Sequence, residues 1–102
     1  MDQAVPGEPD RPVFPREFFD TTLKELAAEY VKEDPDELPP RVVLYLSNGN
    51  TVMVRKIRLL EQERMVVQGK DATSSFWTVI SYRDVTQVIL DSVEGEFRFE
   101  LQ

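Results

Sequence analysis

Apolar residues recur in the N-terminal third of the chain with the spacing of an amphipathic helix. Phe19, Leu23, Leu26, Ala27 and Tyr30 follow one another at intervals of four, three, one and three residues. On a helix these intervals place all five side chains on one side. The pattern therefore predicts a helix that buries this stripe against the rest of the chain.

Prolines mark both ends of this helix. Pro15 suits a first helical turn, where its missing N–H has no partner to lose. Thr22, with Glu25 three positions later, matches a capping box, so a start at Thr22 is the alternative. The helix is expected to end at Asp34, because a residue that precedes a proline is pushed out of the helical region.

From Arg41 onward the apolar period becomes two, which is typical of strands. Asn48-Gly49 supplies the left-handed backbone angles of a tight hairpin turn. The predicted strands cover residues 41–47, 50–60, 65–67, 76–80 and 86–90, with an exposed loop at 69–74 and a single helical turn at 82–85.

The long second strand changes its inward phase. Val52 and Val54 are even-numbered, whereas Ile57 and Leu59 are odd-numbered. A β-bulge at Arg55-Lys56 would keep both halves facing one core and would bend the strand sharply. We therefore expect the stretch from Arg41 to curl into a small closed sheet.

The C-terminal segment alternates strictly, with Phe97, Phe99 and Leu101 on one face, and predicts an extra strand. The predicted fold is mainly β: an N-terminal helix, then a strongly bent five-stranded barrel, then this extra strand. Its segments are a flexible Pro-rich acidic arm (1–14), the helix and an acidic linker (15–40), the barrel (41–91) and the C-terminal strand (92–102).

The chain contains no Cys and no His. Disulfides, thiol nucleophiles, imidazole bases and the usual zinc ligands are thereby excluded. A carboxylate hydrolase is the remaining enzymatic alternative, but it needs a cleft that a lone small barrel rarely provides. We expect no enzyme activity, no catalytic residue, no cofactor and no metal. Without an apolar run of about 20 residues or a signal-like start, we expect no membrane association and a cytoplasmic location.

The net charge of −7 is concentrated in residues 1–40, which hold eleven acids and four bases, while residues 41–102 hold eight of each. The barrel can therefore present a local basic face although the chain as a whole is acidic. The candidate nucleic-acid-binding residues are Arg55, Lys56, Arg58 and Arg64. The alternative is a solvated strand face on which these bases pair with Glu61 and Glu63.

Phe76 and Trp77 are adjacent, so one of the two rings points away from the core unless both faces of the strand are covered. A base-stacking platform is one explanation. A subunit contact or a docked helix is favoured, because aromatic residues anchor such interfaces and Phe97 and Phe99 also need cover. The candidate interface residues are thus Phe76, Trp77, Phe97 and Phe99.

Three stretches between Val42 and Leu90 resemble the Sm-like family, and within it the Hfq branch. They are Leu44 to Gly49, Ile57 to Gln62 leading into Met65-Val66-Val67, and Val79 to Val88. The resemblance implies an N-terminal helix and five bent strands, and rings in which the fourth strand of one subunit pairs with the fifth of the next. Other barrels of the SH3-like kind show similar motifs.

The chain departs from that family at three places. Val54 and Arg55 stand where a mid-strand glycine is usual, Glu63 replaces an RNA-stacking aromatic residue, and Tyr82-Arg83-Asp84 replaces a Tyr-Lys-His run. These losses of aromatic and basic groups argue against the family's uridine site. We therefore expect a non-enzymatic, homo-oligomeric Sm-like assembly module that also offers a surface to a protein partner. The alternative is an RNA-binding Sm-like ring that uses a local basic patch.

Overall fold

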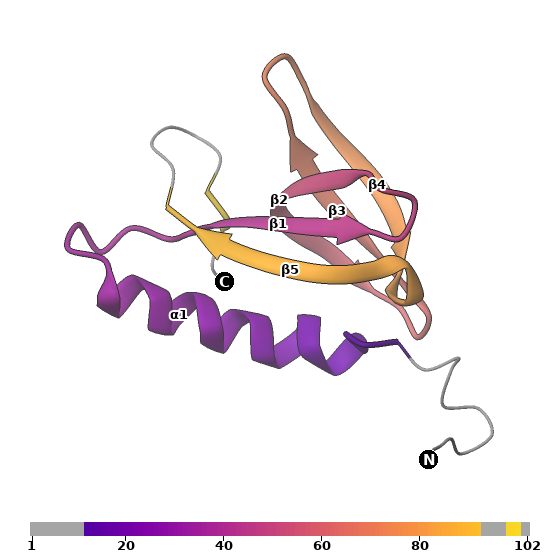
Figure 1. Ribbon diagram of the computed structural model, residues 1–102, viewed down its shortest axis with the longest axis horizontal. Coiled ribbons are helices and arrows are strands. Elements are labelled where there is room, and N and C mark those ends of the chain that lie inside the picture. Colours follow the sequence, from indigo (N-terminus) through magenta and orange to yellow (C-terminus); the bar gives the residue numbers. More distant parts are fainter. Residues whose placement is uncertain (1–11, 93–97, 101–102) are drawn as a thin grey trace.

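The computed structural model describes residues 12–92 and 98–100, which form a helical segment and a five-stranded antiparallel sheet (Figure 1). The elements are the π-helical turn η2 (Phe18–Thr22), α1 (Leu23–Glu33), β1 (Arg41–Leu46), β2 (Thr51–Leu60), β3 (Arg64–Lys70), β4 (Ser75–Ser81), the 3₁₀ turn η3 (Tyr82–Asp84) and β5 (Val85–Asp91). Within these ranges, no helix combines the length and the apolar character that crossing a membrane requires.

The predicted helix is confirmed, and it begins well before Thr22. The chain is helical from residue 16, and the N–H of Phe18 donates to the carbonyl of Pro15 at 2.9 Å. Thr22 has helical backbone angles and its side chain makes no capping hydrogen bond, so the alternative start is not found. The helix ends where Asp34 takes extended backbone angles ahead of a proline.

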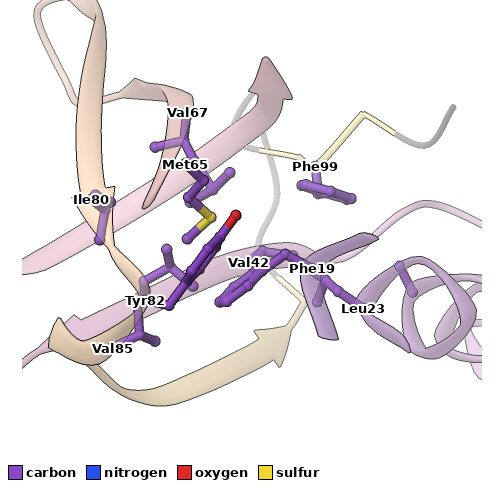
Figure 2. Close-up of a cluster of buried hydrophobic side chains, with 12 residues drawn as sticks. Phe19, Leu23, Val42, Met65, Val67, Ile80, Tyr82, Val85 and Phe99 are labelled. Atoms are coloured by element: carbon purple, nitrogen blue, oxygen red, sulfur yellow. The ribbon is translucent and has the colours of Figure 1, made fainter. Parts of the chain in front are cut away.

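The helix is held against the sheet by residues one turn apart. Phe19, Leu23 and Ala27 are at most 1% exposed. Figure 2 shows the Phe19 ring beside that of Tyr82, and the two rings stack with their centroids 5.8 Å apart. Leu26 lies at the margin of the predicted stripe and is 45% exposed, so the buried stripe is narrower than expected.

The second strand contains the predicted bulge. Between Val54 and Lys56 the pairing with β3 skips Arg55, which is the extra residue. Val54 is buried and Ile57 packs against the same core, so both halves of the strand face inward as expected.

A second bulge, for which the sequence pattern holds no sign, follows at once. The pairing with β3 shifts again between Ile57 and Leu59, with Arg58 as the extra residue. This shift reverses the inward phase a second time. Leu59, which was expected to face the core, is 51% exposed, and Leu60 packs against the core instead.

The sheet is not closed, which corrects the expectation of a closed barrel. Its strand order is β4-β3-β2-β1-β5, so β4 and β5 are two separate edges, and Figure 1 shows β3 and β4 rising away from β1 and β5. A hollow of about 650 Å³ lies beside β4 and is lined in part by Leu46, Val52, Thr78 and Ile80.

The predicted loop at 69–74 is shorter than expected, because β3 continues through Lys70 and β4 begins at Ser75. Gly69 belongs to β3 and pairs with Phe76. A Cβ atom at Gly69 would lie 2.7 Å from two atoms of the Phe76 ring, so the strand needs glycine here for close approach rather than for a turn.

The C-terminal segment packs on the chain's own core. Residues 98–100 are not in a strand, although the N–H of Phe99 donates to Pro40 O at 2.8 Å and the N–H of Glu100 to Arg55 O at 2.7 Å. Phe99 is 2% exposed and belongs to the core. The other residues on which the predicted extra strand depended, Phe97 and Leu101, lie outside the described ranges.

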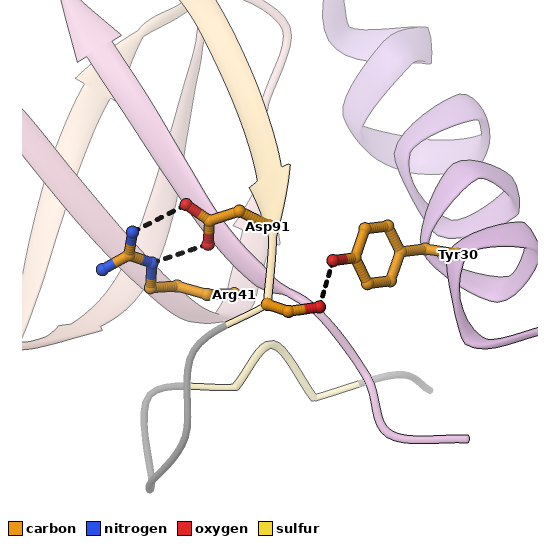
Figure 3. Close-up of polar contacts among 4 residues, drawn as sticks. Tyr30, Arg41 and Asp91 are labelled. Atoms are coloured by element: carbon orange, nitrogen blue, oxygen red, sulfur yellow. Dashed lines mark hydrogen bonds and ion pairs between the residues drawn. The ribbon is translucent and has the colours of Figure 1, made fainter. Parts of the chain in front are cut away.

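Arg41 and Asp91 join β1 to β5 (Figure 3). The guanidinium donates through two nitrogens to the two carboxylate oxygens, at 2.8 and 2.7 Å. Nearby, the hydroxyls of Tyr30 and Ser92 are hydrogen bonded and tie α1 to the end of β5. The hydrogen bond from Arg41 holds the pKa of Asp91 below its ordinary value of 3.8.

Replacing Asp91 with asparagine is expected to lower the free energy of unfolding at pH 7 by about 1 kcal/mol, because partial exposure screens the pair. A carboxylate whose pKa is lower in the folded state stabilises the fold above its ordinary pKa, and the benefit disappears as the pH falls below that value. Urea unfolding of both proteins at pH 7 and at about pH 2.5 measures the difference. A loss of equal size at both pH values would contradict this account.

Candidate interaction surface

Large apolar side chains are exposed on the side of β2, β3 and β4 that faces away from the core, which we call the outer face. Leu59, Trp77 and Val79 are 51%, 62% and 59% exposed. The half-buried Val66 pairs with Leu59 on one side and with Val79 on the other, so an apolar row crosses all three strands. Single exposed apolar residues are ordinary, whereas a contiguous exposed group makes this face a candidate contact surface.

Arg58 lies over the Trp77 ring, with its guanidinium carbon 4.6 Å from the ring centroid. Arg58 is the extra residue of the second bulge, so the bulge presents it on the same side as Leu59. A cation–π contact at an exposed site contributes about 0.5–1 kcal/mol. The contact therefore restrains the largest exposed ring on the outer face.

The four predicted nucleic-acid-binding residues are engaged in other contacts. Arg55 donates to a Glu100 carboxylate oxygen at 3.0 Å, and Lys56 lies 3.9 Å from the other oxygen. Arg64 pairs with Glu61 at 2.8 Å, as the solvated-face alternative expected, and this hydrogen bond raises the pKa of Arg64. The fourth residue, Arg58, lies over the Trp77 ring. Three of the four cations therefore face carboxylates, and one faces an aromatic ring.

Glu100 is the partner that sequence reasoning missed. Its N–H donates to the carbonyl of the bulged Arg55, and its single carboxylate lies within ion-pair distance of two of the four candidate cations. It lies 45 positions from Arg55 along the chain. Such a separation leaves no local spacing signal in the sequence.

The predicted interface residues are divided between three environments. Trp77 is exposed on the outer face, whereas Phe76 is half-buried on the opposite side against Gly69. Phe99 is buried in its own chain, so the structure assigns its ring to the core rather than to a contact surface. Phe97 is outside the described residues.

Leu59 and Val79 were not among the predicted interface residues. Alternation along β4 could have found Val79, because Ile80 beside it is buried and Trp77 lies two positions away. Leu59 could not be found this way, since Leu59 and Leu60 are both apolar and fit either phase of the strand.

In residues 12–92 and 98–100, no group of three or more Asp or Glu side chains is placed to hold a metal ion. The candidate interaction surface in this part of the chain is the apolar outer face with its Arg58–Trp77 pair, next to the β4 edge. Comparisons of the chain with protein-family models, with curated proteins and with solved structures find no match.

Proposed function

We propose that this chain is a non-enzymatic protein-interaction module, a divergent Sm-like domain that binds other protein chains and, first of all, copies of itself. The observation that carries the proposal is the outer face. Leu59, Trp77 and Val79 are each more than half exposed, and this face ends at β4, an edge of the sheet. Aromatic residues with apolar neighbours are enriched in the buried centres of protein interfaces.

The arrangement of the elements supports the Sm-like part of the proposal. An N-terminal helix precedes five antiparallel strands, the second strand is bulged, and the fourth and fifth strands are the sheet edges. Pairing between edges is the means of assembly that the Sm-like resemblance implies. In this account, association with another copy covers an edge that the single chain leaves open.

The distribution of charge favours a protein partner over RNA. Binding to a nucleic acid backbone depends on basic groups that are available to phosphates. Arg55, Lys56 and Arg64 already face carboxylates, and Arg58 lies over the Trp77 ring.

The test is the mass of the full chain in solution, together with its affinity for RNA. Light scattering over a range of protein concentrations is expected to give a mass above the 11.8 kDa of one chain. A labelled single-stranded RNA is expected not to bind at low salt, where phosphate contacts are strongest. A strict monomer at high concentration contradicts self-association, and salt-dependent RNA binding favours the alternative function.

A further inference from the structure

The β4 edge lacks the features that normally keep an edge strand from pairing. Its sequence, Ser-Phe-Trp-Thr-Val-Ile-Ser from Ser75 to Ser81, contains no charged residue and no proline. Its pairing with β3 runs without a bulge over seven consecutive residues, from Arg64–Ser81 to Lys70–Ser75. Natural edge strands are usually protected by charges, prolines, bulges or a covering element. Among the described residues, no strand pairs with the far side of β4.

The β5 edge, in contrast, carries three of these protections. Its pairing with β1 is broken near Thr86, and it ends at the charged Asp91. Figures 1 and 3 show α1 beside β5, and the helical segment is attached at both ends of the strand. Phe19 stacks on Tyr82 before β5, and the hydroxyl of Tyr30 bonds to that of Ser92 after it.

This difference favours a contact that uses the β4 edge alone. A ring in which β4 of one copy pairs with β5 of the next needs both edges, whereas a two-fold dimer needs only one. We propose that two copies of this chain pair β4 against β4, antiparallel and centred on Thr78, to form one continuous sheet. The inference rests on the proposed function, since it specifies how the self-association takes place.

The sequence of β4 suits pairing with itself. Around Thr78 it is close to a palindrome, so that antiparallel self-pairing sets Ser75 opposite Ser81, Phe76 opposite Ile80, and Trp77 opposite Val79 of the other copy. Each of these pairs occurs twice in a two-fold dimer. Aromatic and β-branched residues directly opposite each other stabilise a sheet by about 0.2–1 kcal/mol per pair. The two large exposed apolar side chains of β4, Trp77 and Val79, thereby cover each other.

A single cysteine at Thr78 tests this geometry, because the chain has no cysteine of its own. In the proposed dimer the two copies of residue 78 face each other with Cβ atoms about 5 Å apart. The full-length T78C protein, treated with a short bis-maleimide, is expected to give a cross-linked dimer at low protein concentration. The matched control is Q87C on β5, where the exposed Gln87 has no counterpart in the dimer, and about tenfold less cross-linking is expected. Far-UV circular dichroism checks that both variants fold.

Each outcome of this experiment is decisive. Cross-linking of T78C with itself, at a solution mass of twice 11.8 kDa, supports the proposal. Cross-linking only in a mixture of T78C and Q87C, at a higher mass, indicates β4–β5 rings: the β4–β4 dimer is then wrong although the proposed self-association survives. A monomer without cross-linking overturns both. A dimer in which T78C does not cross-link contradicts the β4–β4 pairing but leaves the proposed self-association standing.

Two lysine substitutions distinguish a dimer contact through the β4 edge from a contact through the outer face as a whole. V79K adds a charge to the edge strand, and we expect its mass to fall to that of one chain. L59K adds the same charge at a similarly exposed residue, 51% against 59%, but two strands away from the edge, and we expect it to remain a dimer. If L59K dissociates as fully as V79K, the contact involves the outer face and not the β4 edge.

Discussion

Replacing Phe99 with alanine is expected to lower the free energy of unfolding by about 3–5 kcal/mol, the usual cost of removing a buried phenylalanine ring. The ring is 2% exposed and lies in the same core as Phe19 and Met65 (Figure 2). Residues 98–100 also make backbone hydrogen bonds to Pro40 and Arg55, and Phe99 is the side chain of this segment that belongs to the buried core. Urea unfolding followed by far-UV circular dichroism measures the loss.

The control for this prediction is Glu100→Ala in the same segment. It removes the ion pairs with Arg55 and Lys56 and keeps both the Phe99 ring and the backbone hydrogen bonds. Because these side chains are partly exposed, we expect a loss of at most about 1 kcal/mol. Equal losses in the two variants would mean that the ion pairs, and not the ring, hold the segment in place.

The sequence predicted the order of the elements well, because the apolar period changes clearly at Arg41. It also predicted the bulge at Arg55, since Val54 and Ile57 cannot both face one core in a regular strand. The second bulge, at Arg58, left no comparable sign in the sequence. Positions 59 and 60 are both leucine, so one leucine faces the core whichever phase the strand takes. The exposure of Leu59 is a consequence of this second bulge.

Long-range contacts account for the other differences. Gly69 followed by a polar run predicts a loop, but Gly69 pairs within β3, and the ring of Phe76 on the neighbouring strand occupies the space that a side chain at position 69 would take. The alternation around Phe99 showed that one face of the segment is buried, without showing against what. In the same way, the sequence supplied the cations of the candidate nucleic-acid patch, while Glu100, which faces two of them, became visible only in the fold.

The part of the β5 edge protection that comes from the helix depends on the contacts that attach the helix. Phe19 and Tyr82 stack, and the Tyr82 hydroxyl donates to the carbonyl of Glu61 at 2.6 Å, so the helix is linked through one ring to the turn between β2 and β3. Burial raises the pKa of Tyr82, in keeping with a phenol that stays neutral inside the fold. Detaching the helix from this ring would remove one of the three protections of the β5 edge.

Phe19→Ala is therefore expected to destabilise the fold strongly, by about 3–5 kcal/mol, because the removed ring is 0% exposed and its neighbours cannot all close the space. Leu26→Ala in the same helix is the matched control. Leu26 is 45% exposed, and alanine favours helix, so its loss should stay below about 1 kcal/mol. Urea unfolding at a fixed protein concentration compares the two variants. If Leu26→Ala costs as much as Phe19→Ala, the helix buries the wider stripe that the sequence pattern predicts, and the attachment through Phe19 and Tyr82 is not what holds it beside β5.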